Sequence, residues 1–394
     1  MRFQYILLVF ALFFVNSASG QYLSDKAEIS LLSYNPVNEI YTIFGHSGVR
    51  VFDPERQINI VFNYGMFDYA APNFTLNFIK GKLNYSLGVQ NFSQVVQYSD
   101  YRNQTLYEQV LNLDKEQKQI VYAFLQNNYK PENRYYMYDF FFDNCATRIR
   151  DILDTTLTST LSYDKTTVTK NLSYRELIQE FTQTQPWLAF GINLIFGLPT
   201  ERKATFEEQM FLPGYLYESF AVGTITTADT TRSLVRMTRP VHIADEIKAE
   251  TDFSVTPNLL FWFLFGLSLI LNITIRKSKI TKIWNGIFML IAGLSGLIFL
   301  VMWFGTEHIP VKNNLNVIWA FPTHLIAAFW IWKSFSKPMY FKIFTAINIL
   351  LLISFPIFLQ QMPTPVIPIL LTLITIGLMN SNLAFIKRIF NKNT

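Results

Sequence analysis

The chain has 394 residues, of which 50% are hydrophobic, 16% are aromatic and only 15% are charged. A soluble globular protein has about a quarter of its residues charged, so this composition excludes a chain that is soluble throughout. The net charge of +5 is unevenly spread: residues 21–256 carry 21 basic and 27 acidic side chains, whereas residues 257–394 carry 11 basic and 1 acidic. Because the basic excess belongs to the apolar C-terminal third, it does not indicate a nucleic-acid partner.

The first 20 residues are typical of a secretory signal peptide. Arg2 supplies a charged start, residues 5–15 an apolar stretch, and residues 18–20 a cleavage site of small side chains. The chain is therefore expected to be exported, with residues 21–256 forming a periplasmic domain. An uncleaved anchor is the alternative, and it would leave this domain on the same side of the membrane.

Residues 257–394 contain five apolar stretches long enough to cross a hydrocarbon core of ~30 Å. The predicted spans are residues 257–275, 283–304, 316–332, 341–360 and 365–385. Ten of the 11 basic residues in this region fall on one face of the resulting topology. By the positive-inside rule that face is cytoplasmic, which agrees with an exported N-terminal domain. We expect a bundle of five transmembrane helices in the bacterial inner membrane, with its C-terminus in the cytoplasm.

The exported segment is predicted to be an α+β domain with its own core. Residues 47–52 and 58–64 alternate in the manner of a β-hairpin, and residues 114–127 and 146–153 have helical spacing. The stretch 186–199 is apolar but too short to span a membrane, so it is either a core helix or one at the lipid interface.

Cys145 is the only cysteine, so no disulfide forms within the chain. It follows an aromatic run and opens a predicted helix, with Asp143 and Asn144 available as helix caps. The partial positive charge of a helix N-terminus lowers a thiol pKa, which favours a nucleophilic thiolate. The alternative is a buried structural cysteine that acts as a small hydrophobic side chain.

A thiolate that attacks an acyl carbon needs a base, and His46, between two glycines at the start of a predicted strand, is the preferred one. Counting back along the hairpin places Asn63 or Tyr64 opposite His46; Asn63 is chosen as the residue that orients the imidazole.

His324 lies inside the third predicted span, where an ionisable side chain is either functional or hydrogen-bonded to a neighbouring helix. No phosphate-binding loop and no zinc-ligand spacing is present, and no cofactor is expected.

These residues resemble the circularly permuted papain-like thiol enzymes, in which a histidine on an early strand meets a cysteine at a later helix start. A closer resemblance covers nearly the whole mature chain. The phrases FGHSGVRVFDP, FNYGMFDYAAPNF, PENRYYMYDFFFDNCATRIRDIL and NLNVIWAFPTHL are similar to those of the Lnb-type lipoprotein N-acyltransferases of Bacteroidota.

The resemblance implies that Cys145 is the nucleophile and His46 the base of an acyl transfer. The acyl donor would be a phospholipid, and the acceptor the N-terminal amine of a diacylated lipoprotein. Tyr64, Asp143, Asn144, Arg148 and His324 are expected to bind substrate or support the site. The alternatives are a membrane-anchored thiol phospholipase or lysophospholipase, a cell-wall peptidase or amidase, and a non-catalytic membrane sensor or scaffold.

Overall fold

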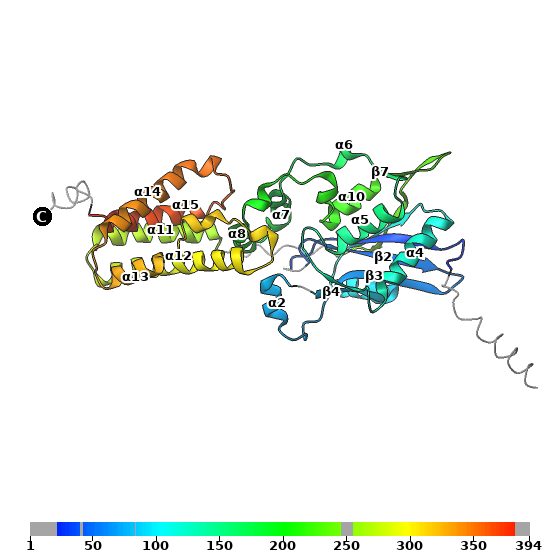
Figure 1. Cartoon of the computed structure of the whole chain (residues 1–394), viewed down its shortest axis with the longest axis horizontal. Helices are drawn as coiled ribbons and strands as arrows, with labels where there is room; N and C mark the ends of the chain where they lie inside the picture. The colour runs from blue at the N-terminus through cyan, green and yellow to red at the C-terminus, as the bar shows by residue number, and fades with distance from the viewer. Residues whose placement is uncertain (1–21, 40–41, 83, 246–254, 383–394) are drawn as a thin grey trace, which may run out of the picture. The chain divides into compact units, whose positions relative to one another are not determined.

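The computed structural model describes residues 22–39, 42–82, 84–245 and 255–382, so the predicted signal peptide lies outside the described residues. Contacts divide these residues into two units (Figure 1). The sheet unit consists of residues 22–74, 84–170 and 205–245, and the helical unit of residues 75–82, 171–204 and 255–382. The prediction of one exported domain over 21–256 thus differs from this grouping, because 75–82 and 171–204 pack with the C-terminal helices.

The sheet unit is built on a seven-stranded antiparallel sheet in the order β10-β5-β1-β2-β3-β4-β6. Its strands are β1 (Glu28–Tyr34), β2 (His46–Asp53), β3 (Ile58–Met66), β4 (Asn84–Asn91), β5 (Leu106–Leu111), β6 (Tyr135–Met137) and β10 (Val235–His242). The predicted hairpin is confirmed: β2 and β3 pair with Val49 opposite Phe62. A small second sheet contains β7 (Leu161–Tyr163), β8 (Gly223–Thr226) and β9 (Thr231–Ser233).

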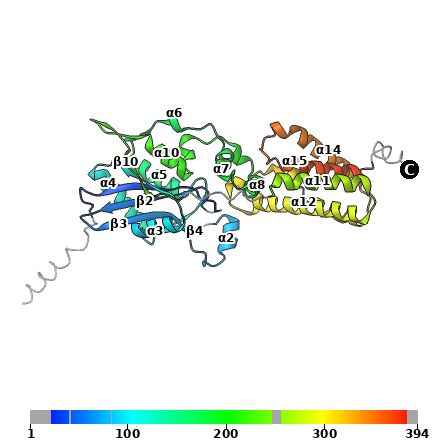
Figure 2. The same ribbon diagram turned by 180° about the vertical axis from the view of Figure 1, so that it is seen from behind.

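Helices cover both faces of the large sheet. The helices of this unit are α3 (Phe92–Tyr101), α4 (Lys115–Tyr129), α5 (Cys145–Thr156), α6 (Lys165–Val168), α9 (Phe206–Gln209) and α10 (Pro213–Ala221). The two longest, α4 and α5, confirm the helices predicted at 114–127 and 146–153. The main core joins β1, β2 and β3 to α4, α5 and α10, whereas α3 packs on the other face of the sheet (Figures 1 and 2).

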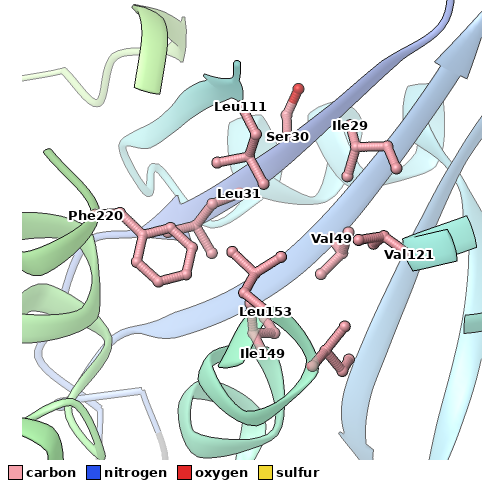
Figure 3. A pocket seen from close by; sticks show the side chains of 10 residues that line it. Ile29, Ser30, Leu31, Val49, Leu111, Val121, Ile149, Leu153 and Phe220 are labelled. Atoms are coloured by element: carbon pink, nitrogen blue, oxygen red, sulfur yellow. The ribbon is translucent and has the colours of Figure 1, made fainter. Parts of the chain in front are cut away.

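The main core is close-packed. Between the sheet and α5 lies a void of about 10 Å³, lined almost entirely by aliphatic side chains and Phe220 (Figure 3). A void of this size holds at most one water, and its lining, with Ser30 as the one polar residue, lacks the roughly 2–4 polar partners that a buried water needs. It is therefore a packing gap and not a binding site.

A buried ion pair fixes the opposite face of the sheet. Arg50 on β2 donates to Glu108 on β5 over 2.9 Å, and the side chains are only 8% and 1% exposed. Arg239 on β10 donates to the same carboxylate over 2.8 Å. The carboxylate thereby connects three strands through charge-assisted hydrogen bonds.

The helical unit contains α11 (Pro257–Thr274), α12 (Lys279–Gly305), α13 (His324–Trp332), α14 (Pro338–Ser354) and α15 (Val366–Asn380), which lie side by side in Figures 1 and 2. It also includes α7 (Tyr174–Thr182), α8 (Pro186–Ile195), most of α2 (Phe74–Lys80) and four short 3₁₀ helices. Those are η1 (Leu198–Glu201), η2 (Ile309–Val311), η3 (Leu315–Ile318) and η4 (Phe355–Ile357).

Among the described residues, three helices are long and apolar enough to cross a membrane: Pro257–Thr274, Lys279–Gly305 and Pro338–Ile357. The third predicted span, 316–332, is instead divided into η3 and the nine-residue α13. Pro322 explains the division, because proline donates no hydrogen bond and disfavours a helical residue before it. At ~1.5 Å per residue, α13 rises roughly 13 Å and α15 roughly 22 Å, which are both less than a ~30 Å hydrocarbon core.

The apolar stretch 186–199 does not belong to the core of the sheet unit. It forms α8, whose Phe190 ring lies 5.4 Å from that of Phe261 on α11. Trp187 remains 47% exposed and donates its Nε1 hydrogen to Val255 O over 2.8 Å. The alternative of a core helix in the exported domain is therefore wrong, because α8 packs on α11, and the alternative of a helix at the lipid interface stays a prediction.

The packing of α5 on the sheet can be tested at Leu153, which is 2% exposed in the main core. We expect Leu153→Ala to destabilise the fold by about 2–5 kcal/mol, since it removes buried methyl groups and leaves a cavity. Thermal unfolding of the full chain in detergent, followed by circular dichroism, measures the loss. The control is Ile120→Ala at a 43% exposed position of α4, which should leave the transition nearly unchanged; equal shifts for the two variants would contradict the assignment.

Candidate active site

The start of α5 is held by the side chain of Asn144, which is 3% exposed. Its Oδ1 accepts from the backbone N–H of Ala146 and Thr147 over 2.8 and 2.9 Å, which caps the helix. Its Nδ2 donates to the carbonyl oxygens of Phe140 and Phe211, each over 2.8 Å. Asn144 therefore fixes the helix start against two other segments, which determines where the next residue lies.

Cys145 is the first residue of α5, and it is 8% exposed. Burial alone would raise the pKa of its thiol. That effect is outweighed by the charge and hydrogen bond of His46, and by hydrogen bonds from the backbone N–H of Ser47 and Ala146, so the pKa is lowered. The position at a helix N-terminus acts in the same direction.

His46 begins β2, directly after a turn that requires glycine. Gly45 has a φ of +76°, and a Cβ on it would come within 2.6 Å of the carbonyl oxygen of Tyr34. Both the backbone conformation and the lack of space restrict this position to glycine. The turn places the imidazole of His46 beside the thiol of Cys145. The centre of the Tyr34 ring lies 5.4 Å from the centre of the imidazole.

The second ring nitrogen of His46 contacts Asn63 on β3. Nε2 lies 2.6 Å from Asn63 Oδ1, and because that oxygen only accepts, Nε2 carries a proton. This leaves Nδ1 of the neutral ring unprotonated and available to the thiol. Asn63 Nδ2 in turn donates to Gln90 Oε1 on β4 over 2.9 Å, so three strands contribute to the arrangement.

The electrostatics favour transfer of the thiol proton to His46. Burial lowers the pKa of the imidazole, but the charge and hydrogen bond of Cys145 and the hydrogen bond to Asn63 raise it by more. A lowered thiol pKa and a raised imidazole pKa together favour a thiolate–imidazolium pair. Such a pair can perform nucleophilic attack on an acyl carbon, followed by proton donation to the leaving group.

Tyr64, Asp143 and Arg148 meet in a second place of the same unit. The Arg148 guanidinium forms a bidentate ion pair with the Asp143 carboxylate and lies 4.1 Å from the Tyr136 ring centre. An open hollow of about 290 Å³ lies here, lined by Tyr64, Phe124, Asn128, Phe142, Asp143, Arg148, Asp151, Ile152 and Thr155. The Tyr64 hydroxyl is buried and has no hydrogen-bond partner within the described part of the chain, and burial raises its pKa.

His324 belongs to the helical unit, and both of its ring nitrogens are used there. Nε2 donates to the carbonyl oxygen of Trp319 over 3.0 Å, and Nδ1 accepts from the Tyr340 hydroxyl over 2.6 Å. The ring thus links α13 to α14. This agrees with the alternative in which His324 is hydrogen-bonded to a neighbouring helix. Among the described residues, no group of three or more His, Cys, Asp or Glu side chains could hold a metal ion.

Two parts of this arrangement were missed by sequence reasoning. Gln90 has no local signal, because its contact with Asn63 depends on the pairing of β3 with β4, in which Gln90 lies opposite Val61. Every residue type except proline would offer the backbone N–H that Ser47 donates to Cys145, so this hydrogen bond leaves almost no trace in the sequence.

The lowered thiol pKa predicts how Cys145 reacts with iodoacetamide. Because only the thiolate reacts, the midpoint of the alkylation rate should lie below the ordinary thiol pKa of about 8.5. In His46→Gln the midpoint should move to higher pH. Intact-protein mass reports the rate directly, since the chain has a single cysteine. A midpoint at or above the ordinary value with His46 present would contradict the assigned ion pair.

Two family profiles match the chain, and together they cover most of it. The Lnb N-terminal periplasmic domain matches residues 14–180, and the Lnb transmembrane domain matches residues 248–388. No curated protein and no solved structure matches the chain. The order of the two matches agrees with an exported N-terminal part followed by membrane helices. The chain belongs to the Lnb family, as a membrane protein with a periplasmic N-terminal domain.

Proposed function

We propose that this protein is a lipoprotein N-acyltransferase that moves a fatty acyl chain from a phospholipid to the N-terminal amine of a diacylated lipoprotein. One observation carries the proposal: the thiol of Cys145, at a capped helix start, is hydrogen-bonded to His46, whose far nitrogen contacts Asn63. This is the donor and acceptor pattern of a thiol acyl-transfer enzyme. Membership of a membrane family with a periplasmic domain supports lipid substrates.

In the first half-reaction the Cys145 thiolate attacks the carbonyl carbon of a phospholipid ester. The carbon–sulfur bond forms, the ester carbon–oxygen bond breaks, and the imidazolium of His46 gives its proton to the departing lysophospholipid oxygen. Asn63 holds the ring through Nε2, so that Nδ1 faces the reacting atoms. The product is an acyl thioester on Cys145.

In the second half-reaction the lipoprotein amine attacks the thioester carbon. His46 accepts the proton of the amine, an amide bond forms, and the sulfur leaves as a thiolate. Thioesters react readily with amines, so no further energy source is needed. Water has to be kept from the thioester, and the burial of Cys145 serves this purpose.

The hollow beside Arg148 is proposed to receive the polar part of one of the two substrates. Its paired charges, Asp143 and Arg148, and the buried hydroxyl of Tyr64 offer both donors and acceptors. We further propose a circularly permuted papain-like relationship for the sheet unit, supported by His46 at a strand start and Cys145 at a later helix start. We also propose location in the inner membrane with a cytoplasmic C-terminus, supported by the basic residues of the C-terminal third.

The proposal is tested with Cys145→Ala and His46→Ala in cells that depend on this protein. Mass spectrometry of their lipoproteins should show the diacyl form, lighter by one acyl chain, while the wild-type chain yields the triacyl form. Lys203→Ala, at an exposed ion pair, is the control and should not change the lipoproteins. Triacyl lipoprotein at wild-type levels in cells that express Cys145→Ala normally would refute the proposal.

Purified protein in vesicles distinguishes the transferase from a hydrolase. With phospholipid and a diacylated lipopeptide, a transferase yields triacyl lipopeptide and lysophospholipid in equal amounts. A thiol phospholipase would instead release free fatty acid and leave the lipopeptide unchanged. A sensor or scaffold would yield neither product.

The positioning role of Asn63 predicts a graded loss of activity. Removal of a general base costs about 10²–10⁴-fold, so His46→Ala should lose at least ~10²-fold in kcat/KM. Asn63→Ala should lose less, because the base stays but its tautomer and orientation are no longer fixed. Asn63→Asp keeps an acceptor for Nε2 and should recover part of that activity, with a pH profile shifted to higher pH. Equal activity of Asn63→Ala and wild type would exclude this role.

A further inference from the structure

The helix α2 carries apolar side chains that are about half exposed. None of its residues is buried, and Leu76, Phe78 and Ile79 are 49%, 49% and 53% exposed. The helix contains no acidic residue, whereas Lys80 and Lys82 lie at its end. Such a short amphipathic segment with basic residues is typical of contact with a lipid surface.

The end of α2 is fixed to the loop that follows α12. Glu307 N–H donates to the carbonyl oxygen of Lys80 over 2.8 Å, and His308 Nε2 donates to that of Phe78 over 2.9 Å. Lys82 and Glu307 form an ion pair of 3.3 Å. Gly81 allows this close approach: its φ is +77°, and a Cβ on it would lie 3.0 Å from the backbone nitrogen of His308.

This loop lies at the end of the bundle where α11 begins. The helix α8 contacts both places, through Trp187 to Val255 before α11 and through Leu194 O, which accepts from Asn314 Nδ2 over 2.8 Å. Because the domain that precedes α11 is periplasmic, the loop after α12 is at the periplasmic surface of the membrane. α2 is therefore held at the same level.

The last turn of α12 carries aromatic side chains of the kind found at membrane surfaces. The rings of Trp303 and Phe304 stack with centres 5.0 Å apart, and Phe304 is 74% exposed. Aromatic residues concentrate at the boundary between headgroups and acyl chains. The loop that holds the end of α2 thus directly follows a helix end suited to that boundary.

We propose that α2 is a membrane-surface helix whose Leu76, Phe78 and Ile79 enter the periplasmic leaflet of the bilayer. The occupant of its apolar surface is phospholipid, with Lys80 and Lys82 at the level of the phosphates. The segment connects β3, which carries Asn63, to β4, which carries Gln90. Contact with lipid is thereby made within the connection between two strands of the site. This inference does not depend on the acyl-transfer reaction.

A fluorescent probe tests the proposal in the full chain. Cys145→Ala removes the only thiol, so Ile79→Cys in that background takes a single environment-sensitive nitrobenzoxadiazole label. In phosphatidylethanolamine and phosphatidylglycerol nanodiscs we expect blue-shifted emission and quenching by lipids brominated near the acyl-chain carbonyl. Leu76→Cys in the same background provides a second position if the first variant does not fold.

Two reference labels define the limits of the measurement. Ile298→Cys, 55% exposed on α12, reports a lipid-embedded position, and Glu116→Cys, on the exposed first turn of α4, reports an aqueous one. Emission and quenching at Ile79 equal to those at Glu116 would overturn the proposal. Because the nanodiscs offer only lipid, this result would mean that α2 does not enter the bilayer and that its apolar side chains serve another partner, such as a protein. All these variants lack the thiol, so the result stands whether or not the acyl-transfer proposal survives.

Discussion

The hydrogen bond between the thiol of Cys145 and the imidazole of His46 is the contact on which the rest of the site depends. It joins a helix start to a strand start, and each is fixed by a separate device. Asn144 caps the helix and ties it to two carbonyl groups, whereas Gly45 permits the turn that brings His46 into place. Neither device involves the reacting atoms, so the geometry exists before any substrate binds.

The fold of the sheet unit explains how residues about a hundred positions apart meet. The core joins α5 to the central strands, and the buried carboxylate of Glu108 holds β2, β5 and β10 on the other face. A rigid sheet between two packed layers keeps the imidazole in one position. This packing favours a reaction that needs the imidazole in one orientation.

Sequence patterns predicted the local features of this protein well. The hairpin of β2 and β3 and the helices α4 and α5 follow from spacing over fewer than 20 residues. The register count within the hairpin was wrong: Val49 pairs with Phe62, so Asn63 lies diagonally from His46 and reaches its ring from there. Sequence patterns did not predict long-range strand pairing: Gln90 reaches Asn63 only because β4 pairs with β3. The span predicted over 316–332 did not allow for the break at Pro322. The apolar stretch 186–199 gave no sign that its partners are Phe261 and Val255. Hydropathy indicates that a segment avoids water, but not which neighbour covers it.

The interleaving of the two units along the chain has a consequence for the protein as a whole. Residues 75–82 and 171–204 leave the sheet unit and return to it, so no single cut separates the two units. A truncated chain that ends before α11 would carry α8 without Phe261 and α2 without Glu307 and His308. Such a fragment would expose apolar helices and tend to aggregate. Loss of the C-terminal helices is therefore expected to shorten the lifetime of the periplasmic domain as well.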